Sequence, residues 1–420
     1  MKPNKKNATA AIAGILIVVL IVCWKMGLGY SENSIGNRNS TENKQQETEA
    51  DQTEYIPAES EEREVSEEEL LEERITAVLD QMTQEQKVLQ MFMITPEALT
   101  GYGTVTAAGD VTYQSLTRYP VGGIILFAQN ILEPGQLTEM NSNLMAYSKE
   151  ITGLPLFLAV DEEGGNVARI ANNSNFQVET FSDMRTIGDS GDTSKGYYVG
   201  STIGSYLHQY GFNLDFAPDA DVLTNAQNQV IGRRSFGTDP TVVSEMSNAV
   251  AQGLKEQQVY ACLKHFPGHG ATTGDTHAGY SYTDKTLDEM MQNELVPFAE
   301  GIQNGISFLM VSHIATPQIT GDNTPATLSG VMIQDILRGQ LGYDGIVITD
   351  AMNMGAIANN YSSAEAAVKA VSAGVDIVLM PKDFESAYQG VLDALERGDI
   401  SQERVNESVR RILRVKLTMQ

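Results

Sequence analysis

Eight short apolar runs, separated by longer amphipathic segments, constrain the fold of this 420-residue chain more than any other feature. Runs such as Leu156–Val160 and Gly345–Thr349 are apolar without alternation, which is typical of strands buried on both faces of a parallel sheet. The eight predicted strands are Gln90–Ile94, Gly123–Phe127, Leu156–Val160, Asn213–Ala217, Tyr260–Lys264, Phe308–Ser312, Gly345–Thr349 and Asp376–Met380. The helical pattern between them is clearest in Gly135–Lys149, Ser194–Gln209, Thr241–Gln257, Leu287–Asn304, Ser363–Ala373, Phe384–Arg397 and Gln402–Leu417.

Strands that alternate with helices in this way predict the α/β class, and eight of them predict a (β/α)8 TIM-type barrel. A doubly wound open sheet is the alternative. That fold usually carries a glycine-rich G-x-G-x-x-G turn after an early strand, and the chain has no such motif there. We therefore expect a single barrel domain over residues 70–420.

The first 29 residues differ from the rest of the chain. Three lysines, at positions 2, 5 and 6, precede the uncharged apolar run Asn7–Trp24. The run has about the length that spans a bilayer, about 17–25 residues, which predicts a membrane anchor over residues 1–29. Lysines on its amino side place that end in the cytoplasm, so we expect one pass and an extracellular remainder. A cleaved signal peptide is the alternative, and the run lacks an A-x-A cleavage pattern.

Residues 30–69 are polar, acidic and almost free of large apolar side chains. Such a segment cannot bury enough surface to offset its ordering entropy, so we predict a disordered acidic linker. The net charge of the whole chain is −26, which argues against a nucleic-acid partner. The only cysteines, Cys23 and Cys262, do not predict a disulfide framework.

Polar side chains follow several of the predicted strands. They are Asp161, Asp219, Lys264 with His265, His313 and Asp350. A barrel gathers the carboxyl ends of its strands in one ring, so we expect these side chains to share a pocket. Asp350 alone could be the N-cap of a following helix. As one of several polar strand ends it could instead be a nucleophile, because a carboxylate can attack an anomeric carbon.

The segment Lys264–His277 contains three of the five histidines of the chain together with several glycines. Asp275 and His277 are two residues apart, so the carboxylate can fix the tautomer of the imidazole and tune it as an acid/base. The His and Asp spacings do not match common zinc sites, and we predict no metal. Asp161 and Arg169 in DEEGGNVAR, and Arg234 in IGRRSFG, could bind the hydroxyl groups of a sugar.

Taken together, the motifs resemble glycoside hydrolase family 3. KHFPGHG followed by D-T-H resembles in particular the bacterial β-N-acetylglucosaminidases that trim peptidoglycan fragments, and DEEGGNVAR, DFAPDADV, IGRRSFG, VSHI and ITDAMNM fit the family in the same order. The resemblance implies a retaining mechanism through a covalent glycosyl-Asp intermediate, without metal or organic cofactor. By position it implies Asp350 as nucleophile, His277 with Asp275 as acid/base, and Asp161, Arg169, Arg234, Lys264 and His265 as ligands of the N-acetylglucosamine ring.

We therefore expect a membrane-held, monomeric β-N-acetylhexosaminidase whose catalytic domain is residues 70–420. Its partner would be a carbohydrate, and its reaction the hydrolysis of terminal non-reducing β-linked N-acetylglucosamine from cell-wall fragments. A β-glucosidase or β-xylosidase is an alternative that the D-x-H element disfavours. A carbohydrate-binding protein without activity is another, but Asp350, His277 and Asp275 are all present.

Overall fold

The computed structural model describes residues 66–272, 274 and 281–419. The predicted anchor, nearly all of the predicted linker, Asp275 and His277 therefore lie outside the described residues. Among the residues it does describe, no helix is both long enough and apolar enough to cross a membrane.

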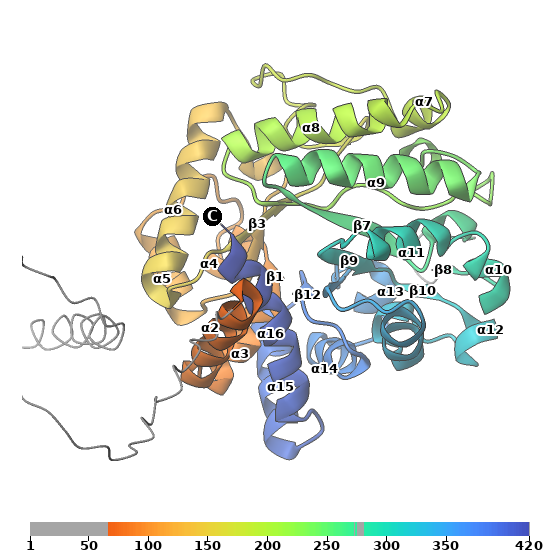
Figure 1. Ribbon diagram of the computed structural model, residues 1–420. Helices are drawn as coiled ribbons and strands as arrows, with labels where there is room; N and C mark the ends of the chain where they lie inside the picture. Colours follow the sequence, from red (N-terminus) through yellow and green to blue (C-terminus); the bar gives the residue numbers. More distant parts are fainter. Residues whose placement is uncertain (1–65, 273, 275–280, 420) are drawn as a thin grey trace, which may run out of the picture. The chain divides into compact units, whose positions relative to one another are not determined.

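Eight parallel strands form a nearly closed barrel (Figure 1). They are β1 (Phe92–Ile94), β2 (Gly123–Ile125), β3 (Phe157–Val160), β6 (Leu214–Asp215), β7 (Tyr260–Phe266), β9 (Phe308–Val311), β11 (Ile346–Thr349) and β12 (Val378–Leu379). Neighbours in the sheet are neighbours in this order, and β12 returns to pair with β1. Among the described residues, one isolated parallel bridge, between Ile348 of β11 and Ile377 just before β12, connects these two strands. All eight predicted strands are confirmed, and the open doubly wound sheet is wrong.

The interior of the barrel is filled by the apolar side chains that marked the runs in the sequence. Every residue of β1, β2, β3, β9 and β11 is buried. Phe157 and Phe308, from β3 and β9, meet edge to face with ring centroids 5.2 Å apart. Such burial on both faces explains why the strands show no polar alternation.

Helices surround the barrel (Figure 1). They are α2 (Glu67–Gln81), α3 (Gln84–Gln90), α4 (Pro96–Thr100), α5 (Asp110–Arg118), α6 (Pro134–Thr152), α7 (Met184–Gly188), α8 (Thr193–Gln209), α9 (Pro240–Glu256), α10 (Leu287–Met291), α11 (Val296–Gln303), α12 (Pro317–Thr320), the π-helix η5 (Val331–Gln340), α13 (Gly355–Ala358), α14 (Ser363–Ala373), α15 (Phe384–Arg397) and α16 (Gln402–Thr418). The single helix predicted over Leu287–Asn304 is wrong, because the chain divides there into α10 and α11. Pro297 lies in the first turn of α11, where its missing N–H costs nothing, so the helix begins there.

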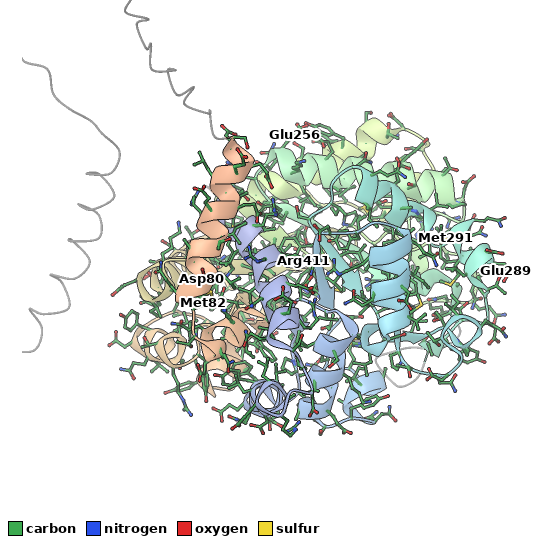
Figure 2. The ribbon with its side chains drawn as sticks, turned by 60° about the horizontal axis from the view of Figure 1, so that its bottom comes forward. Asp80, Met82, Glu256, Glu289, Met291 and Arg411 are labelled. Atoms are coloured by element: carbon green, nitrogen blue, oxygen red, sulfur yellow. The ribbon has the colours of Figure 1, made fainter. Side chains whose placement is uncertain are left out.

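The first described helix packs against the last one. Helix α2 begins at Glu67, ahead of the predicted domain start at residue 70, because Ser66 and Glu69 form a reciprocal capping box at its first turn. Arg414 of α16 forms ion pairs with Glu68 and Glu72 of α2. Figure 2 shows the two helices side by side, with Arg411 on α16.

Candidate active site

A cavity of about 570 Å³ lies at the carboxyl ends of the barrel strands. Asp161 follows β3, Lys264 and His265 belong to β7, and Asp350 follows β11. These four side chains line the cavity together with Arg169 and Arg234. The structure thus brings together all of the predicted site residues that it describes.

Lys264 and Arg234 are fixed by a carboxylate to which the sequence analysis gave no role, Glu163 of the short strand β4 (Glu162–Gly164). Lys264 Nζ lies 2.6 Å from Glu163 Oε1 and 2.8 Å from Asp161 Oδ1. Arg234 donates from Nε and Nη2 to the two oxygens of Glu163, each at 2.8 Å. Burial raises the pKa of the Glu163 carboxyl, but the charges of Arg234 and Lys264 lower it by more. The resulting pKa is well below the ordinary value. In this network the carboxylate of Glu163 is therefore ionised, and it faces the positively charged Lys264 and Arg234.

Arg169 is presented by a hairpin of β4 and β5 (Val167–Ala168). The carboxylate of buried Glu162 accepts the backbone N–H groups of residues 169, 170 and 171 at 2.6, 2.9 and 2.9 Å. Tyr206 donates its hydroxyl to the same carboxylate at 2.8 Å. With its backbone held in this way, Arg169 Nη2 lies 3.5 Å from Asp161 Oδ2.

His265 is held by a second carboxylate that received no role from the sequence, Asp221. His265 Nδ1 lies 2.7 Å from Asp221 Oδ2, and its Nε2 lies 3.3 Å from Arg234 Nη2. Burial, followed by the charge of Arg234, lowers the pKa of His265 to about 4. A neutral ring with its proton on Nδ1 satisfies both contacts, because Nδ1 donates to Asp221 and Nε2 accepts from Arg234.

Asp350 opens toward the cavity from the end of β11. Its N–H donates to Val311 O at 2.8 Å, and its Oδ1 accepts the Ala351 N–H at 2.7 Å. Burial raises the pKa of the Asp350 carboxyl, but His313 and His265 lower it. The Ala351 N–H and Lys264 lower the pKa further, so the net shift is downward and the carboxylate is ionised at neutral pH.

The alternative interpretation, that Asp350 is the N-cap of the following helix, is wrong. The next helix, α13, begins at Gly355, and Met354 is its N-cap residue. Two other polar strand ends, Asp219 and His313, lie behind the cavity and are fully buried. His313 supports the Asp350 loop from there, because its Nε2 lies 3.0 Å from Ala351 O and its Nδ1 lies 2.8 Å from Thr327 Oγ1.

Asp219, Asp221 and His265 place three potential metal-ligating atoms within 4.8 Å of one another. The positive charge beside them already comes from the protein, since Arg234 Nε lies 3.5 Å from Asp219 Oδ2. Asp221 is occupied by His265 and by the His269 N–H, at 2.7 and 2.5 Å. Burial and the neighbouring Asp221 raise the pKa of Asp219 to about 8, which leaves a proton on this carboxyl at neutral pH. The cluster is therefore better suited to orienting His265 than to holding a cation.

The predicted acid/base pair, Asp275 and His277, lies outside the described residues, so its position relative to Asp350 stays a prediction. Glu163 and Asp221 stand within the motifs DEEGGNVAR and DFAPDADV. Their position in these motifs could have marked them as candidate site residues. Their partners, Lys264, Arg234 and His265, are evident only from the folded structure.

Comparison with known proteins gives a consistent result. Residues 83–415 match the model of the glycosyl hydrolase family 3 N-terminal domain. The chain is 36% identical over 325 residues to beta-hexosaminidase A of Pseudoalteromonas piscicida, covering 72% of this chain and 54% of that protein. It is 33% identical over 315 residues to beta-hexosaminidase LpqI of Mycobacterium tuberculosis, covering 72% of this chain and 77% of that protein.

A solved structure, a glycoside hydrolase family 3 beta-N-acetylglucosaminidase from Paenibacillus sp. str. FPU-7, superposes with a TM-score of 0.75 at 36% identity. The superposition covers 80% of this chain and 62% of that one. The chain thus spans little more than half of the length of some of its relatives.

Proposed function

Since the chain belongs to glycosyl hydrolase family 3, we propose that it is a retaining β-N-acetylhexosaminidase that releases terminal β-linked N-acetylglucosamine. One observation carries the proposal: an ionised carboxylate, Asp350, opens into a cavity whose lining includes a network of paired ions and a neutral imidazole. Such a cavity offers a nucleophile beside many donors and acceptors for sugar hydroxyl groups. The names of the relatives, beta-hexosaminidase and beta-N-acetylglucosaminidase, support the choice of sugar.

The proposed reaction has two steps. In the first, a carboxylate oxygen of Asp350 attacks the anomeric carbon, the glycosidic bond breaks, and the leaving oxygen takes a proton from His277. In the second, water attacks the same carbon, gives its proton to His277 and releases the Asp350 carboxylate. Asp275 would hold the imidazole in the required tautomer and stabilise its protonated form. The roles of His277 and Asp275 rest on the sequence motif.

The described ion network would orient the sugar. Asp161 can accept two hydroxyl protons, because Lys264 and Arg169 hold its two oxygens in place at 2.8 and 3.5 Å. Arg234 adds a donor at the same wall, and His265 Nε2, which accepts from Arg234, helps to hold the guanidinium in place. Since Glu163 pairs with both Lys264 and Arg234, and Asp161 pairs with Lys264, these cations can remain charged without the substrate.

The test is hydrolysis of p-nitrophenyl N-acetyl-β-glucosaminide by the wild-type chain and by Asp350→Asn and His277→Ala. Removing the nucleophile should lower kcat by at least about a thousandfold, whereas Asp335→Asn, at an exposed aspartate on η5, should leave kcat unchanged. A slow fluorinated N-acetylglucosaminyl donor should add its sugar mass to the peptide that contains Asp350. Equal or faster hydrolysis of the p-nitrophenyl glucoside or xyloside, or a label on another residue, would reject the proposal.

The same proposal includes the place and source of the substrate. We propose that residues 1–29 hold the enzyme in the cell membrane and that it acts outside on N-acetylglucosamine-containing cell-wall fragments. The lysines before the apolar run support this orientation. After cell fractionation, the full chain should remain with membranes in alkaline carbonate while a chain starting at Glu67 is released. Release of both chains would reject the membrane attachment and leave the reaction itself unaffected.

A further inference from the structure

The proposed reaction does not use a fully buried histidine, His313, which lies two residues after β9 and behind the candidate active site. Its ring contacts an oxygen at each nitrogen. Nε2 lies 3.0 Å from Ala351 O, and Nδ1 lies 2.8 Å from Thr327 Oγ1. Because the side chain has no exposed surface, any role of His313 in the reaction has to act through Asp350.

The protons on the ring follow from what its two partners can donate and accept. Ala351 O is a carbonyl oxygen and can only accept, so Nε2 carries a proton. Thr327 Oγ1 has one proton, and it lies 2.6 Å from Ser312 O and 3.1 Å from Val311 O, which are also carbonyl oxygens. When that proton is donated to a carbonyl, Oγ1 turns a lone pair to Nδ1, so Nδ1 must donate as well. The assignment that satisfies all of these contacts is an imidazolium with a proton on each nitrogen.

The same contacts fix the segment that carries the nucleophile. Ala351 accepts from His313 through its carbonyl, and its N–H donates to Asp350 Oδ1 at 2.7 Å. The imidazole ring and the carboxylate are therefore held by the two ends of a single residue.

The charge of His313 also acts on the nucleophile. Burial raises the pKa of the Asp350 carboxyl, and the positive charge of His313 opposes this rise most strongly, followed by that of His265. At neutral pH His265 is uncharged, because burial lowers its own pKa to about 4. Lys264, which also acts on Asp350, is already paired with two other carboxylates. Two further titratable groups interact electrostatically with Asp350, namely Cys262 and His269.

We propose that His313 is a positioning residue for the nucleophile, a buried imidazolium whose second proton is held by Thr327 and which anchors Ala351 and keeps Asp350 ionised. This inference rests on the proposed role of Asp350 as nucleophile. The carboxylate loses its charge when the glycosyl ester forms and regains it when water releases the sugar. A fixed positive charge beside it favours the ionised form, so His313 should speed the second step relative to the first.

The protonation of the ring can be measured in the full wild-type chain labelled with nitrogen-15 histidine. Nuclear magnetic resonance should show one histidine with protons on both ring nitrogens from about pH 6 to about pH 8, above the range where an ordinary histidine stays charged. Thr327→Val keeps the shape of the side chain but removes the hydroxyl, so the signals that it changes identify His313. A neutral ring at His313 would overturn the proposal.

Kinetics with the p-nitrophenyl substrate test the effect on Asp350. kcat/KM should fall at low pH as Asp350 takes up a proton. His313→Gln keeps a side-chain N–H donor without the charge, so it should move this fall upward by about one pH unit or more. Thr327→Val should move it in the same direction and Thr327→Ser should restore the wild-type profile, so this pair carries the test if His313→Gln does not fold. Intact-mass measurement at steady state should find more sugar-bound chain in His313→Gln than in the wild type.

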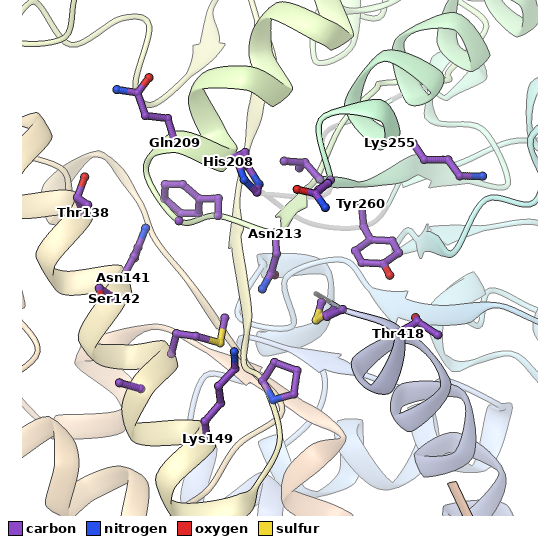
Figure 3. A pocket seen from close by; sticks show the side chains of 18 residues that line it. Thr138, Asn141, Ser142, Lys149, His208, Gln209, Asn213, Lys255, Tyr260 and Thr418 are labelled. Carbon is purple, nitrogen blue, oxygen red and sulfur yellow. The ribbon is translucent and has the colours of Figure 1, made fainter. Parts of the chain in front are cut away.

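His208→Gln is the matched control, at an exposed histidine of α8. Figure 3 shows His208 beside a cavity that Asn213, just ahead of β6, also lines, at the amino ends of the strands. This control should change neither the pH profile nor the sugar-bound fraction. An unmoved profile in folded His313→Gln or in folded Thr327→Val would overturn the proposal. Failure of the wild-type chain to hydrolyse the sugar would reject the proposed function and the positioning role together, whereas a neutral His313 ring in an active chain would reject this inference alone.

Discussion

At the scale of single residues, Asp221 fixes the orientation of His265 in the candidate active site. Its carboxylate is fully buried and joins His265 Nδ1 to the His269 N–H. Asp221→Asn keeps the shape but removes the charge-assisted acceptor, so His265 can lose its orientation. A hydrogen bond of this kind is worth about 1.5–3 kcal/mol, so kcat/KM should fall about tenfold to a hundredfold.

Steady-state kinetics with the p-nitrophenyl substrate would measure this change, and most of it should appear as a higher KM. Asp288→Asn, at an exposed aspartate of α10, is the matched control. A variant with wild-type KM would show that Asp221 does not position His265 for binding.

Glu163 provides a second prediction at this scale, and it concerns stability. It is the shared counter-ion of Lys264 and Arg234, and Lys264 is only 2% exposed. Glu163→Gln should lower the free energy of unfolding by about 3–5 kcal/mol, because Arg234 loses its two-point ion pair and buried Lys264 keeps only Asp161. Urea unfolding measures the loss, with Glu139→Gln at an exposed position of α6 as the control. A loss below 1 kcal/mol would contradict the role of Glu163 as counter-ion.

The sequence could predict which residues gather, but not how they pair. Asp161, Lys264, His265 and Asp350 could be placed at one end of the barrel because each adjoins an apolar strand, and strand ends converge by topology. Glu163 could not be assigned, because its partner Arg234 is 71 residues away and only the folded hairpin brings them together. The role of Asp350 as nucleophile stays a prediction.

At the scale of secondary-structure elements, α16 carries an unusual lysine into the barrel. Lys416 is 1% exposed, its Nζ donates to Gln90 Oε1 at 2.8 Å, and it lies 4.9 Å from the centre of the Phe157 ring. Burial lowers the pKa of Lys416 from 10.5 to about 7. Between these values the unfolded chain binds a proton that the folded chain does not, so stability rises with pH across this window.

The free energy of unfolding should therefore gain about 2 kcal/mol from Lys416 between pH 7 and pH 9, since one pKa unit corresponds to about 1.4 kcal/mol. Lys416→Met should remove this contribution and be more stable than the wild type at pH 7. Urea unfolding at the two pH values, with exposed Lys382→Met as control, measures the difference. The same pH dependence in wild type and Lys416→Met would contradict the lowered pKa.

Elements with a strong period could be predicted from the sequence, and those fixed by long-range contacts could not. Ser363–Ala373 and Phe384–Arg397 agree in both bounds with α14 and α15 because caps and glycines mark their ends. The β4–β5 hairpin has too few residues to show a pattern, and it depends on the buried carboxylate of Glu162. The division between α10 and α11 was signalled by Pro297, which is not tolerated in a helix interior, but the prediction followed the apolar period alone.

At the scale of the whole molecule, the barrel is closed partly by a side chain. The carboxylate of Asp376, fully buried, accepts the Val347 N–H at 2.9 Å and so links the β12 side of the ring to β11. Arg338 and Arg404 contact the same carboxylate at 2.7 and 3.0 Å. Asp376→Asn should therefore lower the free energy of unfolding by about 3–5 kcal/mol, because two arginines lose their buried partner at the seam.

Thermal and urea unfolding would detect this loss, and Asp393→Asn on α15 is the matched control. Hydrogen exchange gives a more local measurement, because the amide of Val347 should exchange faster in Asp376→Asn. Unchanged protection of that amide would contradict the closing role of the side chain.

The pairing of α2 with α16 brings the first and last described helices of the barrel together. A short loop inserted between Met419 and Ser66 could therefore make the domain circular, and new ends could be opened at the exposed turn Gly321–Asn323. Lys416 meets Phe157 at the start of β3, so this junction lies far from the mouth where Asp350 opens. A surface or a fusion protein attached at the junction would leave that mouth unobstructed.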